Sequence, residues 1–364
     1  MMLGLSTEEI IARARADLRI GAPVCVLSGE AGGIALSSEM AAPRRLSEMR
    51  GLGDLDIAVT VRRAETLKAR AYDGDIARIA VTDEMGISGV HAIADPALAM
   101  TRPMLGPFLT RREGSAGPHR VAIWLAKAAR LLPSALIASM DAKAARAIAE
   151  KAGLTVVNDQ MVAEAEAATV DLTPVAAARV PLAVSEASRV HVFRPRSGEE
   201  EHYAIEIGRP DRTAPVLSRL HSACFTGDLI GSLKCDCGPQ LQAALRQIGD
   251  VGAGVLLYLN QEGRGIGLAN KMRAYSLQDE GYDTVEANHR LGFEDDERDF
   301  RIGAAILQRL GFSAVRLLTN NPGKIAAMEA TGVAVAERVP LIVGETAHNV
   351  AYLKTKAKKS GHLL

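Results

Sequence analysis

The residues from Arg219 to Gly238 read RLHSACFTGDLIGSLKCDCG, and they hold three of the four cysteines in the 364-residue chain. Cys235 and Cys237 are separated by one residue, and a loop or hairpin that turns back would bring Cys224 beside them. Three thiolates suit tetrahedral zinc and leave a fourth position for water, which is the pattern of catalytic zinc sites. The stretch therefore predicts a metal centre around which the second half of the chain is organised.

Two other interpretations of these cysteines remain open. A disulfide would leave one spare thiol, but cysteines one residue apart pair poorly and nothing in the sequence indicates secretion. A structural zinc site closed by a fourth side chain, for example His221, is the second alternative. The open and the closed site differ in whether water can reach the metal.

The overall composition limits the possible partners. Lysine plus arginine number 43 and aspartate plus glutamate number 43, so the net charge gives no global electrostatic case for nucleic-acid binding. No apolar run has the length of a membrane span, and the charged N-terminus lacks the apolar core of a signal peptide. We expect a cytoplasmic protein that binds neither nucleic acid nor membrane, with room for a local basic pocket that binds a phosphorylated small molecule.

Helical patterns alternate with short apolar strands along the whole chain. In the first half the expected helices span 6–19, 119–132 and 142–152. The expected strands span 23–27, 76–82, 134–138 and 154–158, and a flexible turn spans 28–33. In the second half the expected strands span 189–193, 202–207, 214–220, 254–259 and 314–319. The expected helices lie around 241–248 and at 268–279, 300–310 and 325–331.

The region from 171 to 188 is rich in Ala, Val and Pro with few charges, and it predicts a linker. A chain of this length can form two domains with separate cores. We therefore expect an α/β (mixed α+β) fold with domains at 1–172 and 173–364, each a mixed sheet with packed helices.

Three polar turns in the second half carry side chains that a core would exclude. In Glu262-Gly263-Arg264 the glycine allows close backbone approach, the guanidinium can bind a phosphate and the carboxylate can accept from a planar base. Lys324 near a helix start also suits a phosphate, and Arg298 lies among the acids of 294–299. Each turn has a structural alternative as well, namely a solvated turn, an exposed lysine, or capping of a helix dipole.

Tyr275 shares a helical stripe with Leu268 and Met272. The stripe predicts a tyrosine in the core. A hydroxyl at the rim of a pocket is the alternative.

From Ser188 to Leu364 the chain resembles GTP cyclohydrolase II. The resemblance is carried by motifs in the family's order, RLHSxCxTGD, SLKCDCG, NQEGRGIGL, KMRAY, DTVEANH, DDERDF and LLTNNPGK. It implies hydrolysis of GTP to formate, diphosphate and 2,5-diamino-6-(5-phosphoribosylamino)pyrimidin-4(3H)-one, the first step of riboflavin biosynthesis. It also implies a homodimer with one zinc ion per subunit, and Mg²⁺ with the substrate phosphates.

The resemblance further implies roles for individual residues. The zinc ligands would be Cys224, Cys235 and Cys237. The GTP site would be lined by Arg219, His221, Ser222, Gln240, Glu262, Gly263, Arg264, Thr284, Thr319 and Lys324. The catalytic residues would be Asp296 as proton acceptor, Arg298 as nucleophile, and Tyr275. Because a guanidine stays protonated in proteins, electrostatic stabilisation by Arg298 is at least as plausible as nucleophilic attack.

Ala223 departs from the family pattern, which usually has glutamate beside the first zinc ligand. Any contact made by that carboxylate is missing here. The departure motivates two alternatives, a relative that acts on another purine nucleotide and a pseudoenzyme that binds GTP without turnover.

Residues 1–172 resemble 3,4-dihydroxy-2-butanone-4-phosphate synthase through the segments LRIGAPVCVL, ADP and PHRVA. That enzyme uses an acidic loop to bind Mg²⁺, whereas Glu30 is the only acid in the corresponding loop here. Arg120 and Val121 stand where the family has Thr and Glu after His119. Since one His and one Glu hold a hard cation poorly, we expect a folded but catalytically silent domain.

Overall fold

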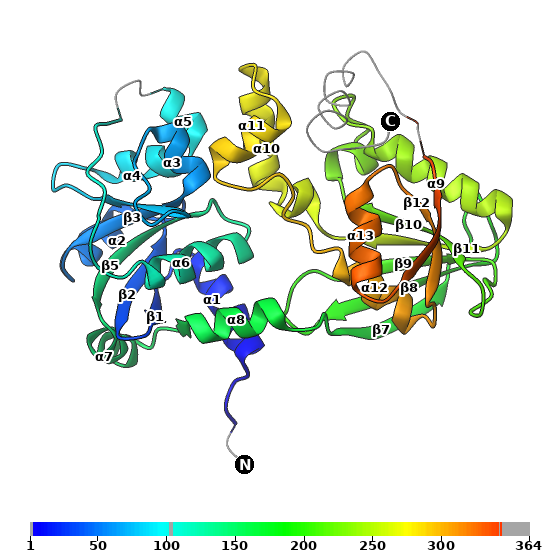
Figure 1. Cartoon of the computed structure of the whole chain (residues 1–364), viewed down its shortest axis with the longest axis horizontal. Helices are drawn as coiled ribbons and strands as arrows, with labels where there is room; N and C mark the ends of the chain where they lie inside the picture. The colour runs from blue at the N-terminus through cyan, green and yellow to red at the C-terminus, as the bar shows by residue number, and fades with distance from the viewer. Residues whose placement is uncertain (1–2, 102–104, 342, 344–364) are drawn as a thin grey trace. The chain divides into compact units, whose positions relative to one another are not determined.

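The computed structural model describes residues 3–101, 105–341 and 343 (Figure 1). The chain divides into two compact units. Unit 1 comprises Met1–Ala168 and Ala269–Asp296, and unit 2 comprises Thr169–Leu268 and Glu297–Leu364. Both units have a mixed β-sheet covered by helices, which confirms the expected fold class. The C-terminal end of the motif region, 344–364, lies outside the described residues.

Unit 1 is built on a six-stranded sheet with the order β4-β3-β5-β2-β1-β6. The strands are β1 (Val24–Ser28), β2 (Ala31–Ser37), β3 (Leu55–Thr60), β4 (Ile76–Ala80), β5 (Ser134–Asp141) and β6 (Val156–Asn158). The pairing of β1 with β6 is parallel, and the other pairings are antiparallel. The helices that precede or connect them are α1 (Thr7–Arg19), α2 (Pro43–Arg50), α3 (Val61–Leu67), α4 (Ile87–Ala94), α5 (Pro96–Met100), α6 (Gly117–Ala128), α7 (Ala142–Ala152) and α8 (Asp159–Ala167).

Side chains of β1 alternate between two hydrophobic clusters, because successive residues of a strand point to opposite faces. Val24 and Val26 join a cluster that includes residues of α1 and α6. Cys25 and Leu27 join the other, which includes residues of α2, α4 and α7. Cys25 is thus a fully buried core residue, as the sequence predicts.

The flexible turn expected at 28–33 is much shorter in the structure. Gly29 and Glu30 form the turn, and strand β2 already begins at Ala31. A Cβ atom on Gly33 would lie 2.9 Å from the carbonyl oxygen of Ala138, and one on Gly32 would lie 2.9 Å from the Cβ of Ala145. The two glycines therefore allow close packing inside a sheet, whereas glycines in a turn allow an unusual backbone conformation.

Two further helices, α10 (Leu268–Asp279) and α11 (Thr284–Leu291), complete unit 1. The guanidinium of Arg273 on α10 binds Asp95 and Glu39, each at 2.9 Å. On the α11 side, Thr60 donates a hydrogen bond of 2.8 Å to the carbonyl oxygen of Gly292. These contacts attach residues 269–296 to the sheet formed by the first part of the chain.

Unit 2 is built on a seven-stranded sheet with the order β13-β12-β10-β11-β9-β8-β7. The strands are β7 (Leu172–Arg179), β8 (Ser188–Pro195), β9 (His202–Ile207), β10 (Val216–Ser222), β11 (Gly254–Leu259), β12 (Ala314–Leu318) and β13 (Ala334–Val339). Its helices are α9 (Cys237–Val251), α12 (Arg301–Arg309) and α13 (Pro322–Ala330), with a π-helical turn at Phe225–Leu229 and a 3₁₀ turn at Glu262–Gly265.

Strands β10, β11 and β12 run parallel at the centre of this sheet, with Ser222 of β10 opposite Leu259 of β11. Helix α9 packs with Leu217 and Leu256, and helices α12 and α13 pack with Leu220 and Val255 in the other cluster. Ligands of α/β sheets bind beyond the carboxyl ends of such strands, where the following turns meet. This edge is where the functional side chains of unit 2 are expected.

The linker expected at 171–188 contains a strand. Residues Leu172–Arg179 form β7, which pairs with β8 at the edge of the sheet, and all of its residues except Leu172 are exposed. An edge strand exposed on both faces shows no apolar alternation, so its Ala-rich sequence resembles a linker. Pro174 is tolerated because an edge strand leaves backbone groups unpaired.

In the part of the chain that the structure describes, no helix is both long enough and apolar enough to cross a membrane.

Candidate functional site

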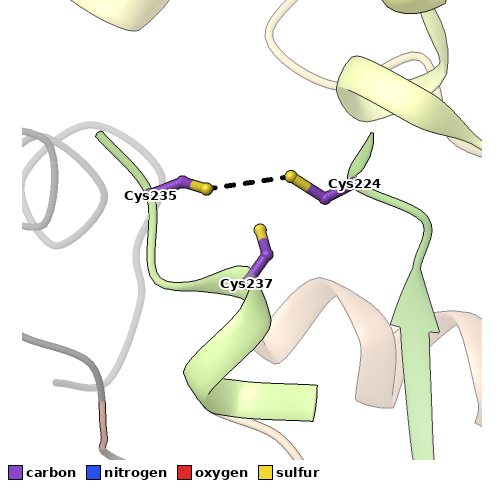
Figure 2. Close-up of side chains that lie close together, drawn as sticks. All are labelled: Cys224, Cys235 and Cys237. Carbon is purple, nitrogen blue, oxygen red and sulfur yellow. Dashed lines mark hydrogen bonds between the residues drawn. The ribbon is translucent and has the colours of Figure 1, made fainter. Parts of the chain in front are cut away.

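The three cysteines of the opening motif come together at the carboxyl end of β10 (Figure 2). Their sulfur atoms all lie within 4.8 Å of one another, and those of Cys224 and Cys235 are 3.8 Å apart. A disulfide needs a sulfur–sulfur distance of about 2.05 Å, and none of the four cysteines is in a disulfide. The disulfide interpretation is therefore wrong, and the cluster could hold a metal ion.

Glycines make room for this cluster. A Cβ atom on Gly227 would lie 2.7 Å from the sulfur of Cys235 and 3.1 Å from that of Cys224. The backbone N–H of Gly227 also donates to the Cys224 sulfur at 3.3 Å. A Cβ atom on Gly238 would lie 2.2 Å from the carbonyl oxygen of Gly227. The two halves of the cysteine loop thus pack closely only because both positions lack side chains.

The pKa of the Cys235 thiol lies above its ordinary value, first because of its hydrogen bond with Cys224 and also because of burial. Neighbouring thiols resist ionising together, since two thiolates repel each other. A bound cation reverses this balance, because a coordinating thiol is deprotonated by the metal. The arrangement is typical of a site that is completed by a cation.

His221 does not close the cysteine site. Its Nε2 atom lies 3.0 and 3.1 Å from the two carboxylate oxygens of Asp228. Burial lowers the pKa of His221, so its ring is neutral at pH 7. Within the described ranges, the group of His, Cys, Asp and Glu side chains with ligand atoms at metal-binding spacing contains the three cysteines alone. The closed site with His221 as fourth ligand is therefore not formed.

Asp228 connects several parts of the site. Besides His221, it accepts a hydrogen bond from the backbone N–H of Cys224 and one from the hydroxyl of Tyr258, each at 3.0 Å. Burial and the negative charge of Asp228 raise the pKa of Tyr258, so its hydroxyl stays protonated. The sequence analysis missed both residues. The TGD motif could have identified Asp228. Tyr258 lies in the apolar strand GVLLYL, where its hydroxyl group is the one feature that could have indicated a functional role.

Two buried cations lie at the same strand edge. Arg219 of β10 donates to the carbonyl oxygen of Leu318 at 2.8 Å and to the side-chain oxygen of Gln240 at 2.6 Å. Burial lowers the pKa of Arg219 to about 10, which still leaves it charged at neutral pH. Lys324, in the first turn of α13, donates to the carbonyl oxygen of Leu220 at 2.7 Å. The structure thus brings Arg219, Gln240 and Lys324 to one edge of the sheet.

Thr319 follows β12 at this edge and is buried. Its hydroxyl accepts a hydrogen bond of 3.0 Å from the backbone N–H of Asn321, which caps α13. The helix expected at 325–331 begins earlier than predicted, at Pro322. Lys324 is therefore held by a helix rather than by a turn.

The turn after β11 has an unusual backbone. Gly263 and Arg264 both have positive φ, 64° and 61°. A non-glycine residue in this region is strained, and such strain concentrates at functional sites. The carboxylate of Glu262 accepts from the backbone N–H of Phe225 at 2.6 Å and from that of Gly263 at 3.1 Å. Glu262 therefore joins this turn to the residue that follows Cys224.

Arg298 and Ser222 are also brought together, because the guanidinium of Arg298 donates to the Ser222 hydroxyl at 3.2 Å. The guanidinium carbon lies 4.9 Å from the centre of the Phe300 ring.

The backbone N–H of Ala223 donates to the carbonyl oxygen of Leu259 at 2.7 Å, so the main chain at Ala223 extends the pairing of β10 with β11.

Tyr275, Thr284 and Asp296 belong to unit 1. Thr284 begins α11, where its hydroxyl accepts from Gln278 at 3.2 Å, and Asp296 is exposed. The core stripe expected for Tyr275 is wrong. Its supposed members Leu268 and Met272 are each 38% exposed, and α10 instead buries Asn270, Ala274 and Leu277. Small and polar residues mark the inward face of this helix, which an apolar stripe does not detect.

Comparisons with known proteins give consistent results for most of the chain. A family model described as GTP cyclohydrolase II matches residues 173–340. GTP cyclohydrolase-2 of Azospirillum brasilense is 42% identical over 358 residues, which cover 96% of this chain and 93% of the relative. GTP cyclohydrolase-2 of Azotobacter vinelandii is 58% identical over 175 residues, which cover 48% of this chain and 84% of the relative.

Among solved structures, a two-domain 3,4-dihydroxy-2-butanone 4-phosphate synthase from A. baumannii aligns with 90% of this chain and 99% of its own. The TM-score is 0.34 and the sequence identity is 14%. A likeness at this level carries no argument about either unit.

Proposed function

This chain belongs to the GTP cyclohydrolase II family, and from this we propose that it hydrolyses GTP to formate, diphosphate and 2,5-diamino-6-(5-phosphoribosylamino)pyrimidin-4(3H)-one, the first step of riboflavin biosynthesis. The observation that carries the proposal is the convergence of three cysteine sulfurs beside buried cations at one strand edge. Soft ligands for a metal and positive charge for a triphosphate are what this reaction requires.

Zinc fits the three sulfurs. With zinc–sulfur bonds of about 2.3 Å, a tetrahedral site separates its sulfurs by about 3.8 Å. The Cys224 and Cys235 sulfurs are 3.8 Å apart, and Cys237 lies within the same cluster. When bound, the ion supplies Lewis acidity that activates water for attack at neutral pH. Three protein ligands would leave a bound zinc ion one position for water, as in catalytic zinc sites.

The cations of unit 2 suit the phosphates of the substrate. Lys324 is fixed by the carbonyl oxygen of Leu220, and this bond leaves its charge intact. Arg264 is presented by a strained turn next to Gly263, where the backbone can approach a ligand closely. We assign both residues to the triphosphate, where Mg²⁺ would supply further positive charge, because loss of diphosphate needs neutralisation of charge.

The guanine base requires acceptors for its N–H groups, and Glu262 is the carboxylate we assign to it. The remaining residues assigned to GTP are Arg219, His221, Ser222, Gln240, Gly263, Thr284 and Thr319. Arg298 donates to Ser222, and because guanidines in proteins are poor nucleophiles, we assign it to electrostatic stabilisation rather than to nucleophilic attack. Asp296 as proton acceptor and Tyr275 as a further catalytic residue rest on their places in the family's motifs.

A direct assay tests the function. Zinc-loaded protein with GTP and Mg²⁺ should release formate and the pyrimidine, and Cys235→Ser should lose both zinc and formate release. The matched control is Cys25→Ala, which removes a buried cysteine outside the cluster and should retain zinc and turnover. Absence of formate from the zinc-loaded wild type would refute the proposal.

The same assay distinguishes the alternatives motivated by Ala223. Turnover of ATP or GDP in preference to GTP would indicate a relative with another purine substrate. Binding of GTP with no product would indicate a pseudoenzyme. Since the backbone at Ala223 keeps its bond to Leu259, we expect GTP to remain the substrate.

For the first part of the chain, residues 1–172, we propose a synthase-like domain without synthase activity. Glu30 is exposed, and Arg120 pairs with Asp75 at 2.8 Å instead of serving a metal. Formation of the butanone phosphate from ribulose 5-phosphate by the purified protein would contradict this. We also propose a cytoplasmic homodimer that binds neither nucleic acid nor membrane, which light scattering and fractionation of cells can test.

A further inference from the structure

Asp228 has three hydrogen-bond donors from three different parts of unit 2. They are the His221 ring on β10, the Tyr258 hydroxyl on β11 and the backbone N–H of Cys224. The Asp228 side chain is only 6% exposed. A carboxylate held from three directions cannot rotate without losing at least one of these bonds, so its two oxygens have fixed tasks.

The arrangement determines which ring nitrogen of His221 carries the proton. An ionised carboxylate only accepts hydrogen bonds, so Nε2 of His221 must be the donor. In a neutral imidazole the other nitrogen, Nδ1, then has a lone pair and can only accept. The ring is further held by the face of Tyr258, with centroids 5.5 Å apart and an angle of 23° between the planes.

Nδ1 of His221 is buried, and within the described ranges it has no hydrogen-bond partner. His221 is 3% exposed. A buried acceptor without a donor is unfavourable, and natural proteins retain such groups mainly where a ligand or water completes them. Beside three cysteine sulfurs and the cations Arg219 and Lys324, the orphaned atom indicates that something with an N–H or O–H donor binds here.

We propose that Asp228 is a positioning residue that holds His221 in the Nε2–H tautomer, so that Nδ1 accepts a hydrogen bond from an N–H group of the guanine base. This inference rests on the proposed function for the identity of the ligand. Guanine carries N–H donors on its N1 and 2-amino groups, and a fixed acceptor that lacks a proton discriminates in favour of such a base. The role of Asp228 is thus to set the orientation and proton position of another residue.

The geometry gives a specific expectation for Asp228→Asn. One carboxylate oxygen accepts from Cys224, Tyr258 and His221, and the other from His221 alone. If the amide oxygen of the new side chain takes the position of the oxygen that binds Cys224 and Tyr258, both of these hydrogen bonds are kept. The amide NH₂ then faces Nε2 of His221 and donates to it, which forces the proton to Nδ1. The variant should therefore keep the cysteine loop and reverse the tautomer.

The test uses full-length, zinc-loaded protein labelled with ¹⁵N-histidine. Nitrogen NMR, assigned by the signal lost in His221→Gln, should show Nε2–H in the wild type and Nδ1–H in Asp228→Asn. In Asp228→Asn the zinc content should be unchanged. KM for GTP should rise at least tenfold, because the Nδ1–H group of His221 would then face an N–H group of guanine, and neither can accept a hydrogen bond. The control Asp211→Asn changes an exposed carboxylate of the same unit and should alter none of these quantities.

A second variant keeps the proposal testable if Asp228→Asn fails to fold. Tyr258→Phe removes one donor to Asp228 and preserves the ring and the carboxylate, so His221 should keep the Nε2–H tautomer. Three results would each overturn the proposal. They are an Nδ1–H tautomer in Tyr258→Phe, an Nε2–H tautomer in Asp228→Asn, and loss of zinc from Asp228→Asn.

Addition of excess GTP separates this inference from the proposed function. In the wild type the Nδ1 signal of His221 should move when GTP binds, whether or not formate is released. A signal that does not move in an enzyme that releases formate would overturn the inference and leave the proposed function intact. A signal that moves without formate release would refute the proposed function alone.

Discussion

A buried histidine lies in each unit, and the comparison of the two shows what separates a site from a core. His119 on α6 and His221 on β10 are 1% and 3% exposed, and in both rings Nε2 faces a carboxylate. In both, Nδ1 has no hydrogen-bond partner in the described part of the chain. Burial and a carboxylate partner are therefore shared, and the difference must lie in what surrounds each pair.

Around His119 the carboxylate is already neutralised. Asp56 lies 3.6 Å from His119 and accepts a hydrogen bond of 2.8 Å from Arg111. Burial alone would raise the pKa of Asp56, but the hydrogen bonds from His119 and Arg111 lower it below its ordinary value. The group behaves as an internal ion pair, in which the charge of Asp56 is balanced by Arg111.

Around His221 the donors to the carboxylate are uncharged, and the cations Arg219 and Lys324 lie near the ring. Tyr258 and the backbone of Cys224 bind Asp228, while Arg219 and Lys324 donate to backbone carbonyl oxygens. Such bonds fix the position of a cation without cancelling its charge. Cations and three sulfurs at the carboxyl ends of neighbouring strands are suited to an anionic ligand and a metal.

The largest expected effect concerns the three cysteine sulfurs of unit 2, because they distinguish the surroundings of His221 from those of His119. Gly227→Ala places a Cβ atom 2.7 Å from the Cys235 sulfur, a distance that real Cβ contacts do not show. Since the opposing atoms belong to the ligand set itself, the sulfurs must separate, and the variant should lose zinc and all measurable formate release. Zinc content by elemental analysis and formate release measure this.

The matched control for Gly227 is Gly231→Ala in the same loop. Gly231 has a φ of 66°, but a Cβ atom there meets nothing within 4 Å. The substitution should cost only the strain of a left-handed residue, about 1 kcal/mol, and retain zinc. Equal loss of metal from both variants would mean that loop conformation, rather than space at the sulfurs, limits binding.

The second expected effect removes one of the cations. Lys324→Met keeps an apolar stem of similar length but loses the ammonium that Leu220 holds. Removal of one fixed charge from a catalytic site lowers the rate by about 100-fold, or about 2.7 kcal/mol, and we expect a loss of this size in kcat/KM for GTP. Steady-state formate release measures it.

Arg111→Met is the corresponding change beside His119. It removes a cation that serves the ion pair of unit 1, so GTP kinetics should stay at the wild-type level while unit 1 loses stability. A drop in kcat/KM comparable to that of Lys324→Met would contradict the distinction between the two surroundings.

The sequence predicted those features of the two units that depend on local patterns. The spacing of Cys235 and Cys237 with an upstream Cys224 indicated the cluster, and the pattern at 6–19 indicated the helix that the structure contains at Thr7–Arg19. Such signals are readable because they involve residues close in the chain or of a rare type.

The remainder depends on contacts that only the folded chain creates. Tyr258 on β11 meets Asp228 in the turn that follows β10, thirty positions away in the chain. The glycines of β2 resemble a turn until the neighbouring strand and helix are in place. Residues 269–296 join unit 1 through Arg273, whose partners Asp95 and Glu39 lie far upstream. Side-chain pairs of this range leave no periodic pattern, so composition and spacing do not detect them.

The smallest expected effect sharpens the description of unit 1 as an ion pair. Asp56→Asn removes the charge that Arg111 and His119 share, and because the Arg111 side chain is 33% exposed, we expect a loss of only about 1–2 kcal/mol in stability. The chain's one tryptophan, Trp124, packs into the α6 side of unit 1, so its fluorescence during urea unfolding reports on this unit.

The pH dependence gives this prediction its sign. Since the pKa of Asp56 is lowered by folding, its contribution is fully present above the unfolded value of about 3.9 and is lost as pH falls through the lower folded value. The stability difference between wild type and Asp56→Asn should therefore be constant from pH 5 to 7 and shrink below pH 4. A difference that instead persists in acid would mean that Asp56 acts through its shape rather than its charge, and the contrast with Asp228 would then have to rest on the sulfurs and cations alone.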